Sequence, residues 1–133
     1  MTTYFENISF GTSHNYDFVE LEDKLNQVIK NSEIKNGICV AFAPHATGVI
    51  VITELESRIK KDIEKFLNNL VPSGGWAHSG NADAHLKSML LNPCKIVPVI
   101  NNRIAIGRWQ SIFFIEIDGG RSNRMLTVVV IGD

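Results

Sequence analysis

The sequence predicts an α+β fold, in which an antiparallel β-sandwich-like sheet is combined with two longer helices and one short helix. Three observations support this class. Short apolar segments rich in β-branched residues recur along the chain, two segments carry apolar residues at helical spacing, and most adjacent strands are close enough in sequence to pair antiparallel. The length of 133 residues, of which 44% are hydrophobic, fits one domain over residues 1–133 with a single core.

The first part of the chain is predicted to contribute three strands and a helix. Thr3–Phe10 alternates between apolar and polar residues as a strand does. In Phe18–Lys30 the apolar residues fall on one helical face, and Asp17 is a candidate N-cap for that helix. Gly37–Ala43 and Gly48–Thr53 are short apolar runs beside turn residues, which is the pattern of buried strands.

Two further helices are predicted in the centre of the chain. Leu55–Leu70 is the longer one, and Ala82–Leu91 can form a short helix after the Pro-Ser-Gly-Gly break that begins at Pro72. The longer helix carries a stripe of apolar residues that we expect in the core. These residues are Ile59, Ile63, Phe66, Leu67 and Leu70.

The C-terminal part is predicted to form four strands. They are Lys95–Ile100, Arg103–Ile106, Gln110–Asp118 and Met125–Ile131. The pair Asn101-Asn102 separates the first two strands and favours a hairpin. Cys39 and Cys94 both lie in apolar strand contexts, which favours buried thiols over a disulfide or a zinc-binding pair.

The composition excludes several classes of partner. The formal net charge is -1 and the pI is about 6.4, so no general attraction to nucleic acid or to an anionic membrane surface is expected. No apolar run approaches the length that spans a bilayer, and the N-terminus lacks a basic region followed by an apolar one. We therefore expect a cytoplasmic protein with no nucleic-acid or membrane partner.

The stretch HSGNADAH at residues 78–85 is a candidate metal site. His78 lies on a loop and His85 in the first turns of the predicted helix, while His45 follows a buried strand in the stretch PHATG. Three histidines form a common first shell for zinc and leave a fourth position open for water or substrate. The alternative is a solvated polar loop that leads into a helix.

Three acidic residues are candidates for chemistry near these histidines. Asp83 could bind the metal, orient a histidine, or serve only as a carboxylate at a helix N-terminus. Glu54 closes a strand after His45, and Glu116 lies in a strand after Trp109. Either glutamate could be a general acid or base or a magnesium ligand, and the alternative is a solvated side chain.

A second candidate site surrounds the stretch Gly107–Gln110. Arg108 and Arg121 can grip phosphate in a bidentate way, and Gln110 can both donate and accept hydrogen bonds. A phosphate or pyrophosphate site is therefore one interpretation. The alternative is a hairpin with solvated arginines and with Trp109 in the core. No Gly-rich phosphate-binding fingerprint is present, so ordinary nucleotide binding lacks support.

Three stretches in this order resemble the YjbQ-like family, whose members are often named secondary thiamine-phosphate synthase enzymes. They are PHATGVIVITE, HSGNADAHLKSMLL and IAIGRWQSIFFIEIDGGR. The matching positions are His45, Thr47, Glu54, His78, Gly80, Asn81, Asp83, Ala84, His85, Gly107, Trp109, Gln110, Asp118, Gly119 and Arg121. Family members often carry Thr at the positions of Ala46 and Arg108, and Glu at the position of Ser79, which bears on the identity of the substrate.

The resemblance implies an α+β fold built around a β-sandwich, a homotrimer, and histidines gathered near a cleft. It also implies a weak thiamine-phosphate synthase-like activity, which joins a pyrimidine pyrophosphate to a thiazole phosphate and releases pyrophosphate. On this basis we expect three groups of site residues. They are His45, His78 and His85 for the metal, Asp83, Glu54 and Gln110 for catalysis, and Asn81, Arg108, Trp109, Arg121 and Thr47 for a small phosphorylated substrate.

The choice of metal separates the functional hypotheses. Three histidines suit zinc, whereas release of pyrophosphate suits magnesium. One alternative to the synthase is therefore a zinc-dependent hydrolase of a small phosphorylated or amide substrate. Another is a trimer that binds a metal or a small ligand without catalysis.

Overall fold

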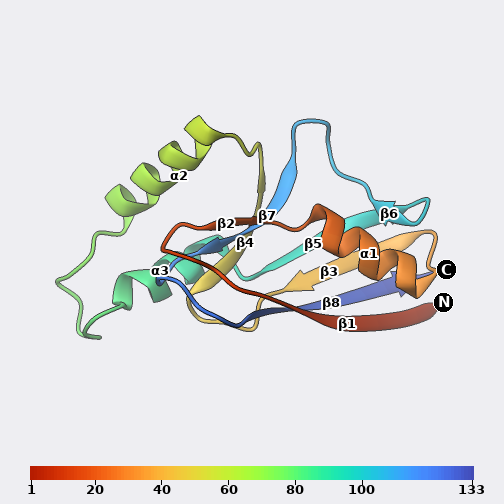
Figure 1. Ribbon diagram of the computed structural model, residues 1–133, viewed down its shortest axis with the longest axis horizontal. Helices are drawn as coiled ribbons and strands as arrows, with labels where there is room; N and C mark the ends of the chain where they lie inside the picture. The colour runs from red at the N-terminus through yellow and green to blue at the C-terminus, as the bar shows by residue number, and fades with distance from the viewer.

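The computed structural model describes residues 1–133, which form three helices and eight strands (Figure 1). The helices are α1 (Glu22–Ser32), α2 (Ser57–Leu70) and α3 (Ala82–Leu91). The strands are β1 (Thr2–Phe10), β2 (Phe18–Glu20), β3 (Gly37–Phe42), β4 (Gly48–Thr53), β5 (Cys94–Ile100), β6 (Arg103–Ile104), β7 (Ser111–Glu116) and β8 (Arg124–Gly132). The predicted α+β class is confirmed, and the limits of most strands differ from the predicted ones by only a few residues.

The strands form two antiparallel sheets. The larger has the order β1-β8-β3-β5-β6, and the smaller has the order β2-β7-β4. The main core lies between the two sheets and is closed by α1, with Leu25 and Ile29 from the helix and Phe114 from β7 among its members. A second, smaller core on the other face of β7 includes Phe113 and Leu67 of α2. Strand β7 is therefore buried on both faces, which explains its continuous apolar run.

The helix predicted over Phe18–Lys30 begins four residues late, and this part of the prediction was wrong. Phe18–Glu20 is a short strand that pairs with β7, and the helix starts at Glu22. Phe18 packs edge-on against Phe113, with 5.8 Å between ring centroids, so its burial comes from a sheet contact. Asp17 does not cap the helix, because its carboxylate accepts a hydrogen bond from the Ser13 amide instead.

The apolar stripe of α2 is only partly in the core, which corrects the prediction for Leu55–Leu70. The helix is capped by the Glu56 carboxylate, which accepts from the Ile59 amide at 2.7 Å. Leu67 is buried, but Phe66 and Leu70 remain 61% and 50% exposed. The helix stands at one end of the molecule, beside the smaller sheet and away from the larger one (Figure 1). It therefore covers too little of the sheets to bury its whole stripe.

The predicted hairpin around Asn101-Asn102 is confirmed. Both asparagines have positive φ angles, 53° and 64°, as a two-residue turn of the primed type requires. The Asn102 side chain donates to the carbonyl oxygen of Ile29 at 3.1 Å and to that of Ile34, which ties the hairpin to the end of α1.

Both cysteines carry free thiols, and no helix is long and apolar enough to cross a membrane. Cys39 is buried, as predicted, and burial raises the pKa of its thiol to about 12. Cys94 is only half-buried, because it lies at the start of β5 on the side of the sheet that faces away from the core.

Substitution of Gly48, the first residue of β4, should destabilise the fold. A Cβ at this position would overlap the ring of Phe114, which is fully buried and has no room to move. We expect Gly48→Ala to lower the free energy of unfolding by about 1–3 kcal/mol in urea denaturation. Gly11→Ala is the control, because its Cβ would meet Ser122 at an ordinary 3.5 Å. Equal effects of the two substitutions would contradict the prediction.

Candidate functional site

His85 on α3 lies where two pockets meet. One pocket, of about 270 Å³, is lined by His45, Ala46, His85, Ser88, Met89 and Pro93. The other, of about 320 Å³, is lined by Trp76, His78, Ala82, His85 and Leu86. The fold thus places the three predicted histidines around one short helix, with His85 common to both pockets.

The rings of His78 and His85 lie at a separation that a shared metal ion allows. Their centroids are 5.0 Å apart and their planes are inclined by 75°. Two imidazoles bound to one zinc ion at about 2.1 Å, in tetrahedral geometry, have centroids roughly 5 Å apart. The same spacing also suits an edge-to-face contact between two rings without a metal. The separation of the two rings is therefore compatible with either arrangement.

His45 is held by the backbone of β8. Its Nε2 lies 3.1 Å from the carbonyl oxygen of Met125 and 2.9 Å from the amide nitrogen of the same residue. The Met125 amide donates to Nε2, and in this tautomer the proton of the neutral ring lies on Nδ1, which then cannot bind a metal ion. In the other tautomer Nε2 donates to the Met125 carbonyl and Nδ1 is left without a protein partner. Metal-binding histidines commonly donate their second ring nitrogen to a backbone carbonyl in this way. His45 therefore fits the role of a ligand through Nδ1 only in the tautomer that protonates Nε2, which gives up the hydrogen bond from the Met125 amide.

The complete three-histidine set is not assembled in the structure. No group of three or more His, Cys, Asp or Glu side chains lies close enough together to hold a metal ion. His45 shares a pocket with His85 but not with His78. The three-ligand site therefore stays a prediction, and its formation requires a movement of at least one side chain.

A buried hydroxyl adjoins the pocket between His45 and His85. Ser88 is one turn after His85 on α3 and lines that pocket. Its Oγ is the only buried side-chain nitrogen or oxygen atom without a hydrogen-bond partner. Unsatisfied buried hydroxyls are costly, so native proteins usually supply them with a partner, a water molecule or a ligand. The sequence pattern gave no sign of this residue.

A buried ion pair, Glu116–Arg124, lies beside the histidine region. Arg124 Nε donates to Glu116 Oε1 at 2.8 Å. Arg124 Nη2 donates to the hydroxyl oxygen and to the carbonyl oxygen of Thr47, both at 3.0 Å. Both partners of the pair are nearly inaccessible. Thr47, predicted to bind substrate, is therefore already engaged with Arg124.

Arg124 was not among the residues predicted from the sequence, although a signal for it was present. Leu126, Val128 and Val130 of β8 all point into the core. Because side chains alternate along a strand, Arg124 must point inward as well. An arginine at an inward position requires a buried anionic partner. Glu116, on the apolar strand that precedes β8 in the sequence, was the candidate for this partner.

The network extends from the ion pair to the start of α3. The Thr12 hydroxyl donates to Glu116 at 2.6 Å and accepts from the backbone amide of Arg121 at 2.9 Å. The Asp118 carboxylate accepts from both Asn81, at 2.8 Å, and the Arg121 guanidinium, at 2.7 Å. Asn81 immediately precedes α3, so this chain of hydrogen bonds fixes the helix that carries His85.

Asp83 lies on the other side of α3 from His85. Two residues along a helix correspond to a rotation of about 200°. The Asp83 carboxylate is 3.4 Å from the ammonium group of the buried Lys87, which also donates to Asn68 at 2.9 Å. Asp83 thus takes part in holding α3 against α2, and the structure does not bring it to the histidines.

The predicted residues of the stretch Gly107–Gln110 lie on the loop between β6 and β7. Trp109 is 70% exposed, with the Arg108 guanidinium 5.0 Å from the ring centroid, so the tryptophan is not in the core. Gln110 accepts a hydrogen bond from the Gly107 amide at 2.7 Å. Figure 1 shows this loop on a different side of the molecule from α3, and none of these residues lines the histidine pockets.

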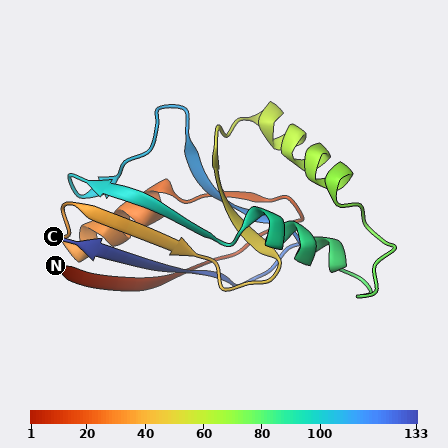
Figure 2. The same ribbon diagram turned by 180° about the vertical axis from the view of Figure 1, so that it is seen from behind.

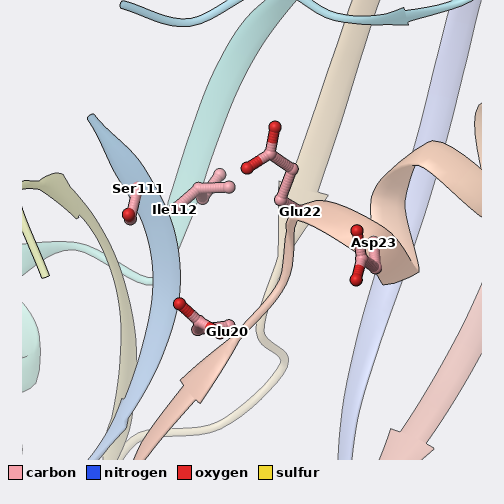
Figure 3. A pocket seen from close by; sticks show the side chains of 5 residues that line it. All are labelled: Glu20, Glu22, Asp23, Ser111 and Ile112. Carbon is pink, nitrogen blue, oxygen red and sulfur yellow. The ribbon is translucent and has the colours of Figure 1, made fainter. Parts of the chain in front are cut away.

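Two other acidic regions add no metal site. Glu54 is exposed in the connection between β4 and α2 and lines none of the pockets described here. A separate pocket of about 140 Å³ near the start of α1 is lined by Glu20, Glu22 and Asp23, with Ser111 and Ile112 (Figure 3). Its three carboxylates are set apart around the pocket and do not gather as metal ligands (Figure 3).

Comparison with known proteins assigns nearly the whole chain to one family. The model of the UPF0047 protein YjbQ-like family matches residues 6–133. The chain belongs to the YjbQ-like family. A UPF0047 protein of Methanothermobacter thermautotrophicus is 40% identical to this YjbQ-like chain over 136 residues, which cover 99% of the chain and 94% of the relative. YugU of Bacillus subtilis, another UPF0047 protein, is 28% identical, with 86% and 90% covered.

Solved structures of YjbQ-like proteins share the fold. A crystal structure of a protein from Sulfolobus solfataricus superposes with a TM-score of 0.94 at 36% identity and covers 99% of both chains. A family protein from Clostridium acetobutylicum gives a TM-score of 0.89 at 30% identity, with 95% of this chain and 99% of that chain covered. The first is described as a protein of unknown function and the second as uncharacterised, so the family fixes the fold and leaves the activity open.

Loss of the Arg124 side chain should strongly destabilise the protein. In Arg124→Met, the Glu116 carboxylate would stay buried without its partner. Breaking a buried pair in this way costs about 3–5 kcal/mol, which urea denaturation can measure. Arg58→Met removes the corresponding cation from the exposed Arg58–Glu56 pair and should have little effect. A small effect of both substitutions on the free energy of unfolding would contradict the prediction, because the fold would then accept the buried Glu116 carboxylate without a partner.

His45 should titrate below the usual histidine range. Burial lowers its pKa, and so does the positive charge of Arg124, whereas the hydrogen bond to Met125 and the charge of Glu116 oppose this change. The unfolded chain then takes up a proton before the folded one, so this contribution to stability is present above about pH 6.5 and is lost as the pH falls toward the folded pKa. NMR titration of the ring protons can check the direction. In Glu116→Gln the His45 pKa should fall further, and a rise would contradict this account.

Proposed function

We propose that the chain binds a divalent metal ion, zinc by preference, through His45, His78 and His85, and uses it on a small phosphorylated molecule. The observation that carries the proposal is the position of His85 between two pockets, each of which contains one of the other two histidines. The 5.0 Å separation of the His78 and His85 rings supports a shared ion. The Met125 carbonyl supports a role of His45 as a ligand through Nδ1 in the tautomer that protonates Nε2, and this tautomer gives up the hydrogen bond from the Met125 amide.

The unpartnered hydroxyl of Ser88 gives independent support for a ligand in this region. It adjoins the pocket that contains His45 and His85, and it can both donate and accept a hydrogen bond. A metal-bound water molecule or a phosphate oxygen would supply the missing partner. A bound zinc ion would supply a Lewis acid that stabilises negative charge on a substrate or leaving group.

The substrate class follows from the family resemblance. The synthase reaction named for the family releases pyrophosphate, and a metal ion together with Arg121 would offset the charge of that leaving group. Arg121 is linked to the start of α3 through the Asp118 carboxylate, which it shares with Asn81. The three imidazoles favour zinc over magnesium, which supports the zinc-dependent hydrolase as the second candidate.

We also propose that the protein works as a homotrimer, as the family resemblance implies. The loop with Arg108, Trp109 and Gln110 does not reach the histidine pockets of its own chain. In an assembly, the exposed Trp109 of one copy could border the pockets of another. The roles of these residues, and of Asp83 and Glu54 in catalysis, therefore belong to the assembled protein in this proposal.

Metal binding can be tested with matched histidine variants. Wild-type protein should bind about one zinc ion per chain, measured by competition with a chromogenic chelator. Loss of an outer partner of a ligand costs about 10–100-fold in affinity, so His85→Ala, which removes a ligand, should cost more than that. His14→Ala is the control, because His14 is exposed and lies in a different pocket. Binding should weaken below about pH 6.5, where free histidine is protonated.

Unchanged zinc affinity in His85→Ala would refute the metal proposal. Turnover assays separate the functional candidates when zinc does bind. A synthase requires the pyrimidine pyrophosphate and the thiazole phosphate together, whereas a hydrolase acts on one substrate with water. A binding protein without catalysis shows no turnover in either assay.

A further inference from the structure

We propose that Lys87 of α3 is a positioning residue for the His78–His85 pair and acts through Asn68 of α2. Lys87 is only 2% exposed although it is a lysine, and it lines neither of the histidine pockets. Its ammonium group donates to Asn68 Oδ1 at 2.9 Å. The inference rests on the proposed function for its consequence in metal binding, whereas the placement of the two rings can be measured without a metal ion.

The loop that carries His78 is not tied to the rest of the chain by hydrogen bonds. Residues 72–80 are all exposed, and none of them forms a hydrogen bond with a residue outside this stretch. The Trp76 indole nitrogen donates to the Pro72 carbonyl oxygen at 2.9 Å, within the loop itself. Figure 2 shows the loop projecting beyond the sheets between the ends of α2 and α3. His78 is therefore placed by these two helix ends and by its contact with His85.

A single hydrogen bond joins the two helices, and Lys87 donates it. No other hydrogen bond or ion pair connects a residue of α2 with a residue of α3. Asn68 lies in the last turn of α2, three residues before the C-cap Val71. The bond thus fixes the end of α2 from which the loop departs, relative to the helix that carries His85.

The buried charge of Lys87 favours the docked position of α2. A buried ammonium group is costly unless its donors have partners. The Asp83 carboxylate, on the same helix, is 3.4 Å away, which is longer than the roughly 2.7–2.9 Å of a charge-assisted hydrogen bond. Asn68 supplies the closer acceptor, and it belongs to the other helix. If α2 moved away, Lys87 would lose this acceptor, whereas an apolar side chain would make no such demand.

Tyr16 connects the same acceptor to the smaller sheet. Its hydroxyl donates to Asn68 Oδ1 at 2.8 Å, and Lys87 Nζ lies 5.5 Å from the centre of its ring. The backbone amide of Tyr16 donates to the Glu116 carbonyl oxygen of β7 at 2.7 Å. Asn68 is therefore the point at which α2, α3 and the segment before β2 meet. A functional side chain on a loop needs such a rigid support to keep its place.

Lys87→Met tests the role, because it removes the charge and keeps the length of the side chain. In metal-free protein, NMR should show the ring-proton signals of His78 and His85 moving toward those of free histidine as their edge-to-face contact is lost. Asn68→Leu, at an exposed residue, removes the acceptor and should have the same effect. Lys65→Met, at an exposed lysine of α2, is the control.

The same NMR measurement separates positioning from a contribution to stability alone. Unchanged His78 and His85 signals in Lys87→Met or in Asn68→Leu would overturn the proposal, even if the variant unfolds at lower urea concentration. Equal changes in Lys65→Met would overturn it as well.

Zinc affinity gives a second readout and keeps the two proposals apart. Loss of a group that orients a metal ligand costs about 10–100-fold in affinity, so Lys87→Met should weaken zinc binding by that factor in the chelator competition. Wild-type affinity in Lys87→Met would overturn the positioning role and leave the metal proposal standing. Wild-type protein that binds no zinc would refute the proposed function, and the NMR signals would then decide the role of Lys87.

Discussion

The buried pair of Glu116 and Arg124 is the interaction on which the arrangement of the polar groups around the histidines depends. Removing two charges from water costs several kcal/mol per ion unless each is fully hydrogen-bonded. Glu116 accepts from Arg124, from Thr12 and from the Asp118 amide. Burial by itself raises the Glu116 pKa, but these hydrogen bonds together outweigh it and keep the pKa below its usual value. The carboxylate therefore stays charged at neutral pH.

The pair connects segments that are distant in sequence. Arg124 begins β8, and its donors fix Thr47 just before β4, two residues after His45. Through Asp118 the same network reaches Asn81 at the start of α3. The segments that carry His45 and His85 are thus joined to one buried centre. The positive charge of Arg124 also lowers the His45 pKa, which favours the neutral imidazole that a metal ion requires.

Sequence patterns predicted those elements whose own residues decide their structure. The strand Gly48–Thr53, the helix Ala82–Leu91 and the turn at Asn101-Asn102 are found at the predicted positions. The predicted start of α1 was wrong because the apolar Phe18 fits the pattern of a helix as well as that of a strand. Pairing with β7 decides between the two structures. The exposed edge of α2 was missed for a similar reason, since spacing shows a stripe but not how much of it the fold covers.

The candidate site was predictable in part, for physical reasons that differ between residues. The position of His85 beside His78 follows from a loop and a helix that are adjacent in sequence. Asp83 was grouped with them because of its proximity in sequence, whereas the helical rotation turns it toward Lys87. Ser88 carries no motif, and its importance comes only from its burial and its unmet hydrogen bond. Arg124 carries no motif either, but the alternation of side chains along β8 was a signal that it points inward.

The two candidate regions of this chain lie apart in the structure. The histidine pockets lie at α3, and the loop with Trp109 lies between β6 and β7, with no shared pocket residue. The loop with Trp109 therefore contributes nothing to the histidine pockets of its own chain. In the proposed homotrimer, Trp109 of one copy would border the histidine pockets of another, whereas metal binding by the histidines requires no second copy.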